Sequence, residues 1–251
     1  MVSKRRATVA SRTLADQLRP IVHVQTAVRA SDYARVDVEH ARARIRSGRI
    51  AFDAGRILAD AGDLAPAFER TVEAFEQTGI AVTPRVAALQ KTTVDATAQV
   101  LAWANVESPP RDPAMRLARR VAGILGNAIL SRAATDTTTG ISLIPWKRPQ
   151  CPCCGASPDL ALATDTRRTL VCWRCDTMWR TDERGCLGCG ANGSPAIARV
   201  PSPYLGYELA ICNSCGRYLK ERRGALTHEL VVERALTAGL DEAAQLRGLR
   251  A

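Results

Sequence analysis

The sequence has few aromatic residues, few lysines and no long apolar run. Aromatic side chains make up 4% of the 251 residues, and alanine is abundant, so we expect a core of closely packed helices. Only 4 of the 35 basic residues are lysine and the other 31 are arginine, with a formal net charge of +10. Because the arginines are spread along the chain and alternate with acidic residues, they indicate a solvated helix surface rather than a nucleic-acid-binding stripe.

The lack of a long apolar run argues against a membrane span. The most apolar segment, VAGILGNAIL at 121–130, is far shorter than the roughly 20 residues that cross a bilayer. Residues 3–6, SKRR, loosely match a twin-arginine export signal, but no apolar run of roughly 7–15 residues follows them. We therefore predict a cytoplasmic protein with no membrane span.

Cysteine is absent from residues 1–145, and this region has the pattern of a helical bundle. Leu64, Phe68, Val72 and Phe75 form one apolar stripe at helical spacing. Cap residues, prolines and glycines predict four helices. The first is at 33–52, after Ser31 and Asp32, and the second is at 66–77, before Gly79. The third runs from Pro84 to before Pro109, and the fourth follows Asp112-Pro113, with Leu125 and Ile129 facing the core.

The remaining sequence begins with a connector at 135–150 that is rich in small polar residues, glycine and proline. Short strand-like runs then occur at 160–164, 167–172, 196–200 and 207–212. The segment 226–249 returns to a helical pattern, with Gly239 as a candidate break.

All nine cysteines lie between residues 151 and 215, and eight of them form C-x-x-C pairs. The pairs are Cys151/Cys154, Cys172/Cys175, Cys186/Cys189 and Cys212/Cys215. A reducing cytosol disfavours structural disulfides, and an odd number of cysteines fits complete disulfide pairing poorly. Both thiolates of a C-x-x-C pair can bind one ion, and a tetrahedral S₄ site needs two pairs. The eight paired cysteines therefore predict two metal sites.

Pairing in chain order is the simplest arrangement, with spacers of 17 and 22 residues inside the two sites. Interleaved pairing, the first pair with the third and the second with the fourth, also agrees with the spacing. Glycine, which accepts positive φ, follows three of the pairs, whereas Asp176 follows the second. Cys153 lies between two predicted ligands and is expected to be a free thiol.

These spacers are typical of ribbon or rubredoxin-type modules. We therefore predict an α+β fold in three parts: an N-terminal helical bundle (1–145), two small rubredoxin-like or zinc-ribbon metal modules in tandem (146–223), and a C-terminal helical segment (224–251). Spacing alone does not choose between iron and zinc, because both accept four thiolates.

The sequence offers no catalytic constellation. Gly188, Gly190 and Gly193 match G-x-G-x-x-G, but they lie in and after a cysteine turn with no strand before them. His228 and Glu229 begin an H-E-x-x-H pattern whose second histidine is replaced by Val232. With no Ser/His/Asp arrangement and no P-loop, we predict that the protein is not an enzyme.

Four segments give the chain a family resemblance. They are CPCCGASP (151–158), LVCWRCDTMW (170–179), CLGCG (186–190) and YELAICNSCGRYLK (207–220), and LDEAAQLRG (240–248) adds a similar ending. In these segments the sequence resembles the formate dehydrogenase accessory proteins, the FdhE family, over roughly its last 100 residues. Cys153 and Asp176 depart from the family's pattern.

The resemblance implies a cytoplasmic accessory protein that matures respiratory formate dehydrogenase by acting on its catalytic subunit. It also implies that the eight paired cysteines bind iron in two rubredoxin-like sites, with zinc as the alternative metal. Two other functions remain open at this point. One is a zinc-ribbon nucleic-acid-binding protein, in which arginines and lysines of the cysteine region contact phosphates; the other is a rubredoxin-like electron carrier.

Overall fold

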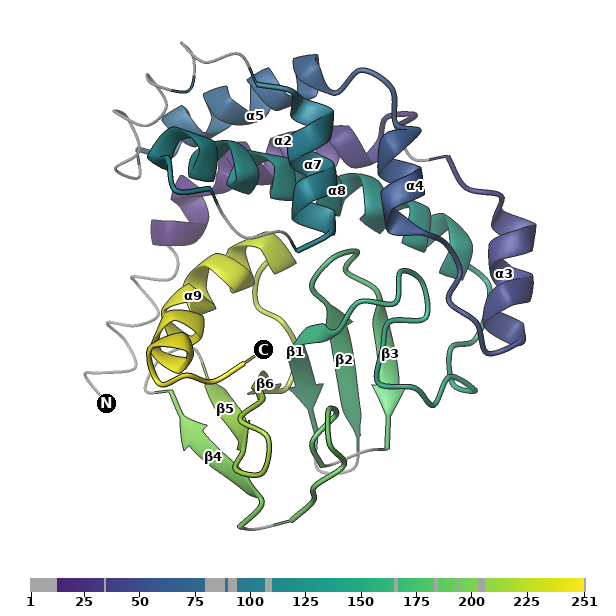
Figure 1. The fold of residues 1–251 in the computed structure, drawn as a ribbon, viewed down its shortest axis with the longest axis vertical. Coiled ribbons are helices and arrows are strands. Elements are labelled where there is room, and N and C mark those ends of the chain that lie inside the picture. The colour runs from purple at the N-terminus through teal and green to yellow at the C-terminus, as the bar shows by residue number, and fades with distance from the viewer. Residues whose placement is uncertain are drawn as a thin grey trace. The chain divides into compact units, whose positions relative to one another are not determined.

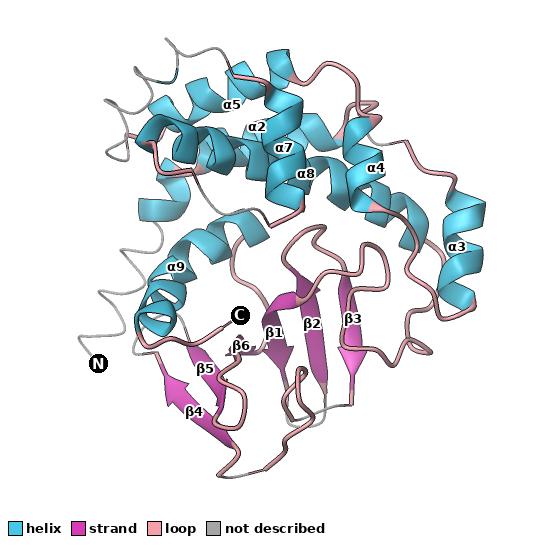
Figure 2. Cartoon of the chain, viewed as in Figure 1, coloured by secondary structure: helices cyan, strands magenta, loops and turns pink. Residues whose placement is uncertain are grey.

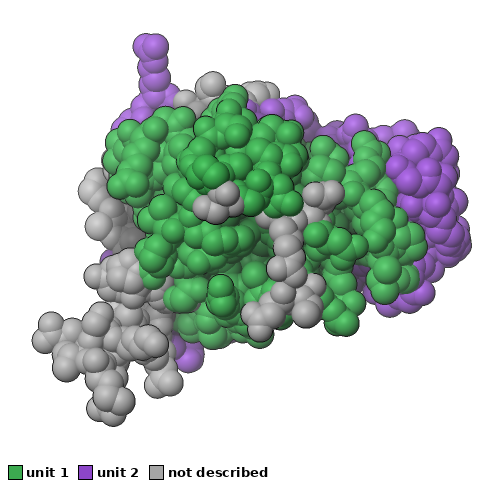
Figure 3. Space-filling model, turned by 90° about the horizontal axis from the view of Figure 1, so that it is seen from below, with its two compact units in different colours: residues 1–15, 142–251 green, residues 16–141 purple. Residues whose placement is uncertain are grey.

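The computed structural model describes residues 13–33, 35–79, 89, 94–106, 110–164, 167–182, 185–193, 195–202 and 206–250. The chain divides into two units, a helical unit (Asp16–Ile141) and a sheet unit (Ser142–Ala251 together with Met1–Ala15), shown in Figure 3. The predicted α+β class is confirmed, because helices precede a six-stranded mixed sheet and another helix ends the chain (Figure 2).

The helical unit is built around one long helix, α8 (Pro113–Thr138), whose inner face includes the fully buried Leu125 and Ile129. Shorter helices pack against α8, and the predicted apolar stripe lies on one of them. These helices are α2 (Arg19–Arg29), α3 (Val38–Arg46), α4 (Ala54–Ala59), α5 (Ala65–Gln77) and α7 (Ala96–Ala104), labelled in Figure 1.

Aspartate side chains cap several of these helices. Asp112 accepts a hydrogen bond from the backbone N–H of Met115 and begins α8, as the sequence predicts. The predicted helix at 33–52 is wrong in its bounds, because Asp37 rather than Ser31 or Asp32 caps α3. The predicted helix start at Pro84 and its end at Pro109 lie outside the described residues.

Two glycines let α7 approach α8 closely. A Cβ atom built on Gly126 would lie 2.5 Å from Cζ3 and 2.7 Å from Cε3 of Trp103, and one on Gly123 would lie 2.9 Å from the Trp103 Nε1 atom. The indole ring therefore occupies the space that side chains would fill at these two positions. Glycine in the middle of a helix is destabilising. The close packing of Trp103 explains why α8 has glycine at these two positions.

The sheet unit repeats one pattern twice. Each module consists of a C-x-x-C turn, two strands, a second C-x-x-C turn and a third strand. The third strand of each module adds to the short strands that the sequence predicts. The first module holds β1 (Pro158–Ala163), β2 (Arg168–Cys172) and β3 (Met178–Thr181), and the second holds β4 (Ile197–Pro201), β5 (Tyr207–Cys212) and β6 (Tyr218–Arg223).

One parallel strand pair joins the two modules into a single sheet, with strand order β3-β2-β1-β6-β5-β4. The strands within each module pair antiparallel, whereas β1 and β6 run parallel, with Leu160 opposite Lys220 and Ala163 opposite Arg223. An ion pair from Arg168 on β2 to the buried Glu221 on β6 crosses the same junction. The two modules are therefore held together by backbone and side chains.

Helix α9 (Leu230–Leu246) packs against one face of this sheet. Leu230 and Leu240 contact the buried Leu160, Val171 and Tyr207. The helix continues through Gly239, so the predicted break is absent. No helix among the described residues has the length and apolar character needed to cross a membrane.

The close contact between Gly126 and Trp103 can be tested by substituting the glycine. Gly126→Ala should lower the free energy of unfolding by about 1–3 kcal/mol, because the rigid indole ring must move to admit the new methyl group. Urea unfolding followed by far-ultraviolet circular dichroism measures this change.

The matched control is Gly239→Ala in α9, where a Cβ atom would meet nothing within 4 Å. This substitution should stabilise the helix by up to about 1 kcal/mol. Equal effects of the two substitutions would show that the indole ring does not constrain α8.

Candidate metal centres

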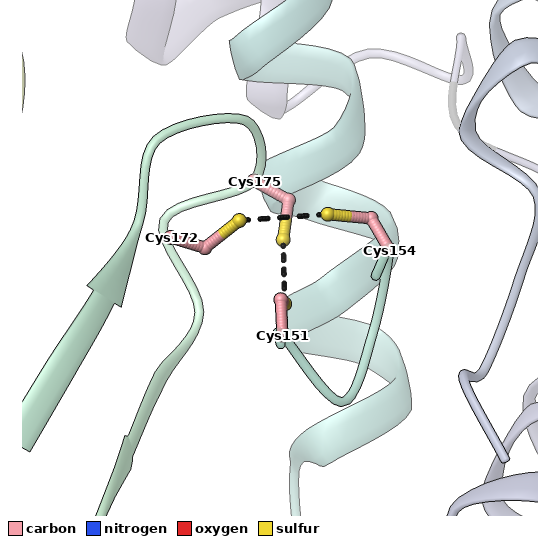
Figure 4. Close-up of side chains that lie close together, drawn as sticks. All are labelled: Cys151, Cys154, Cys172 and Cys175. Atoms are coloured by element: carbon pink, nitrogen blue, oxygen red, sulfur yellow. Dashed lines mark hydrogen bonds between the residues drawn. The ribbon is translucent and has the colours of Figure 1, made fainter. Parts of the chain in front are cut away.

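The structure gathers the eight paired cysteines into two separate groups of four. The first cluster is Cys151, Cys154, Cys172 and Cys175, and the second is Cys186, Cys189, Cys212 and Cys215. The pairs group in chain order, with one cluster in each module. The structure therefore does not have the interleaved pairing. Figure 4 shows the four sulfur atoms of the first cluster pointing toward one another.

Distances within both clusters are alike. The Sγ atoms of Cys151 and Cys175 are 3.5 Å apart, as are those of Cys154 and Cys172. The second cluster repeats these values for Cys186 with Cys215 and for Cys189 with Cys212. All ligand atoms of a cluster lie within 4.8 Å of one another, and no cysteine is in a disulfide.

Four sulfurs at these distances fit a tetrahedral metal ion. A metal–sulfur bond of about 2.3 Å places tetrahedral sulfurs about 3.8 Å apart, close to the observed separations. The all-thiolate donor set suits zinc or iron equally. The residues present therefore fit one ion in each cluster.

The four C-x-x-C turns share one backbone geometry. In each turn the N–H of the residue after the second cysteine donates to the carbonyl of the first cysteine, over 2.8–3.2 Å. That residue has positive φ in every turn. It is Gly155 (φ 73°), Gly190 (φ 76°), Gly216 (φ 68°) or, in the second turn, Asp176 (φ 58°). Asp176 therefore adopts a conformation that glycine accepts more readily.

An ion pair with helix α9 accounts for the aspartate at this position. Arg234 donates through Nη1 to Asp176 at 2.7 Å, through Nε to Asp159 at 2.8 Å, and through Nη2 to the carbonyl of Cys172 at 2.8 Å. The two carboxylates outweigh the effect of burial and raise the pKa of Arg234. Arg234 thus ties α9 to a turn that carries two ligands of the first cluster.

The two clusters differ in exposure. Cys151, Cys154, Cys172 and Cys175 are all buried, with at most 5% of their surface exposed. In the second cluster only Cys212 is buried, Cys186 and Cys215 are half-buried, and Cys189 is exposed. The first cluster is therefore closed to solvent, whereas the second is open on one side.

The buried thiols of the first cluster have unequal pKa values without a metal. Burial raises the pKa of Cys151, but hydrogen bonds from neighbouring thiols, with Cys153 first, hold it well below its usual value. Burial and neighbouring thiols raise the pKa of Cys172 and Cys175 well above theirs. A metal ion bound here must displace protons from the raised thiols, so binding weakens as pH falls.

The second cluster has a similar asymmetry. Burial raises the pKa of Cys212, but the backbone N–H of Cys215 and other hydrogen bonds lower it to about 6. The backbone N–H of Arg217 lowers the pKa of Cys215, but burial and the neighbouring thiols raise it to about 12. Hydrogen bonds within this turn therefore favour the thiolate form of Cys212.

The ninth cysteine lies against the first cluster. Cys153 is fully buried, and its hydrogen bond with Cys151 raises its pKa well above the usual value. It remains outside the group of four whose sulfurs face one another.

Side chains that no metal or catalytic motif singles out hold α9 to the sheet. Asp241 accepts from the hydroxyl of Tyr218 at 2.9 Å and from the ammonium of Lys220 at 2.6 Å. The buried Glu233 accepts from the hydroxyl of Tyr207 at 2.8 Å. Tyr218, Lys220 and Asp241 belong to two segments that carry the family resemblance. The resemblance therefore marks these residues, but the sequence does not show that they contact one another.

Several basic residues of the sheet unit form ion pairs with acidic residues and are shielded from solvent. Arg168 pairs with Glu221, Lys220 with Asp241, and Arg222 with Glu233 at 3.7 Å. These three cations are well shielded from solvent in the sheet unit. Their charges are therefore not available to the phosphates of a nucleic acid.

Comparison with solved structures supports the fold that the resemblance implies. The crystal structure of the FdhE protein from Pseudomonas aeruginosa is similar to this chain with a TM-score of 0.62 and 18% sequence identity, over 95% of this chain and 90% of that chain. At this identity the likeness shows a shared fold. No protein-family model matches the sequence, and no curated protein matches it.

The ion pairs of Arg234 provide a test of how α9 is held. In the zinc-loaded protein, Arg234→Ala should lower the stability of the sheet unit by about 3 kcal/mol, because Asp159 and Asp176 lose their shared cation in a largely buried site. Urea unfolding followed by near-ultraviolet circular dichroism measures the loss.

Arg247→Ala is the control, since it removes the same charge from an exposed position just after α9. It should change the stability by less than about 0.5 kcal/mol. If Arg234→Ala is as mild as this control, the ion pairs with Asp159 and Asp176 do not anchor the helix.

Proposed function

We propose that this protein is an accessory protein for the maturation of respiratory formate dehydrogenase. It acts in the cytoplasm on the catalytic subunit of that enzyme and carries out no reaction of its own. Its two four-cysteine clusters bind iron.

The observation that carries this proposal is the fold shared with the FdhE protein. The likeness covers 95% of the chain, so it includes both the helical unit and the sheet unit with its two clusters. The motif resemblance in the last 100 residues points to the same family independently of the fold. Together they favour an accessory role over a function of an isolated metal ribbon.

The proposed metal sites rest on the two groups of four sulfurs. Cys151, Cys154, Cys172 and Cys175 would hold one ion, and Cys186, Cys189, Cys212 and Cys215 the other. Four thiolates around iron allow transfer of one electron with little rearrangement of the ligands. The choice of iron over zinc comes from the family resemblance, since the donor set accepts either.

The alternative of a nucleic-acid-binding zinc ribbon has less support. Three of the cations that would contact phosphates, those of Arg168, Lys220 and Arg222, are paired with carboxylates in the sheet unit. Four other arginines of the cysteine region, Arg167, Arg180, Arg217 and Arg223, are exposed, so only the three shielded cations count against this alternative.

Deletion of the gene should abolish respiratory formate dehydrogenase activity while the enzyme's subunits are still synthesised. The tagged chain should also capture the catalytic subunit from cell extract. The double substitution Cys186→Ser/Cys189→Ser, which removes two proposed ligands, should restore little activity to the deletion strain. Activity is measured by formate-dependent dye reduction.

Cys153→Ala is the matched control, because it removes a cysteine that lies outside both groups of four. This variant should restore activity in full. Normal formate dehydrogenase activity in the deletion strain would refute the proposed function.

The identity of the metal has its own test. Protein purified without oxygen should contain about two iron ions per chain, one for each four-cysteine cluster. It should absorb visible light when oxidised and lose that absorption when dithionite reduces it. A colourless protein with two zinc ions, isolated from cells supplied with ample iron, would contradict iron as the resident metal.

A further inference from the structure

We propose that the two clusters have different roles, in which the second cluster exchanges its ion with ligands in solution and the first holds its ion permanently. The competing ligand is a small chelator that reaches the ion on the side of Cys189. This inference rests on the metal-binding part of the proposed function and adds a division of labour between the sites.

The first cluster is closed by groups within its own unit. Its four cysteines are 0–5% exposed, and Cys153, which belongs to the first turn, has none of its surface exposed. The hydroxyl of Thr177 lies 3.1 Å from the Cys175 sulfur. Arg234 binds the second turn through Asp176 and the carbonyl of Cys172. A ligand of this cluster can leave only if the surrounding packing opens as well.

The second cluster lacks such a cover at its first turn. Gly188, Cys189 and Gly190 are all exposed, and Cys186 is half-buried. The side chain of Arg217 lies against Gly188, where an added Cβ atom would be 2.6 Å from Arg217 Cδ. Cys189 therefore borders solvent, where a competing ligand can approach.

The two turns of the second cluster are also anchored unequally. The turn of Cys212 and Cys215 is tied to distant segments: Asn213 donates to the carbonyl of Pro195 at 2.7 Å, and Arg250 donates to the carbonyl of Cys215 at 2.7 Å. Within the first turn, Cys186 N–H donates to the carbonyl of Ala191 and Gly190 N–H to that of Cys186. Its long-range contacts include the sulfur pairs with Cys215 and Cys212, and Arg168 donates to the carbonyl of Gly185 just before the turn. Opening therefore starts at Cys189, the exposed ligand.

The exchange is a substitution of ligands without a redox step. A donor atom of the chelator forms a bond to the ion while the bond from the ion to Cys189 Sγ breaks. The freed thiolate takes up the proton that the chelator loses on binding. Local opening of a few exposed residues needs far less free energy than unfolding of a packed core, so the rates at the two sites should differ widely.

The test uses the full-length chain loaded with two zinc ions and mixed with excess 4-(2-pyridylazo)resorcinol. One equivalent of zinc should leave about tenfold or more faster than the second, as the colour of the zinc–chelator complex reports. Iodoacetamide added during the fast phase should alkylate Cys189 first, and the four cysteines of the first cluster should stay protected, as peptide mass spectrometry shows.

Two matched variants assign the phases to the clusters. Cys189→Ser and Cys154→Ser each remove the second cysteine of the first turn of a module. Cys189→Ser should keep the slow phase, lose the fast one and retain its far-ultraviolet spectrum. Cys154→Ser should lose the slow phase or fail to fold, and either result agrees with a fixed structural ion in the first cluster.

The outcomes separate this inference from the function it rests on. A chain that binds no zinc or iron would refute the metal sites themselves. Two ions that leave at equal rates, or a fast phase that persists in Cys189→Ser, would refute only the division of labour.

Discussion

Each module of the sheet unit closes on four sulfur atoms. Its strands are only four to six residues long; one C-x-x-C turn precedes the first strand and the other joins the second strand to the third. Short strands with a small core are marginal without a further link between them. Convergence of the thiols to within 4.8 Å sets the distance between two turns that the chain separates by 17 or 22 residues. The strand register and the docking of α9 both depend on this closure.

The cysteine spacing predicted the clusters well because a C-x-x-C turn is local, and its geometry needs only four or five adjacent residues. The grouping into 151–175 and 186–215 follows from short spacers that fold back as hairpins. The departure at Asp176 was visible in the sequence, but its reason was not. The compensating cation, Arg234, lies 58 residues further along the chain.

Strand β6 could not be found from its sequence, YLKERR, which has the composition of an exposed loop. Lys220 and Glu221 are buried there because Asp241 and Arg168 supply opposite charges from distant parts of the chain. Similarly, Asp37 caps α3 although Ser31 and Asp32 are equally good caps by type. Only tertiary packing chooses among such candidates, whereas α8 has a strong apolar face and a single well-placed cap.

The parallel pairing of β1 with β6 relates the two modules by a translation along the sheet rather than by a twofold rotation. The first strand of one module lies beside the third strand of the other. A head-to-tail contact of this kind is heterologous and leaves complementary edges, β3 and β4, at the two ends of the sheet. Such edges invite further copies to add on without limit. Pro201 and Arg199 on β4 and the brevity of β3 are features that disfavour such addition.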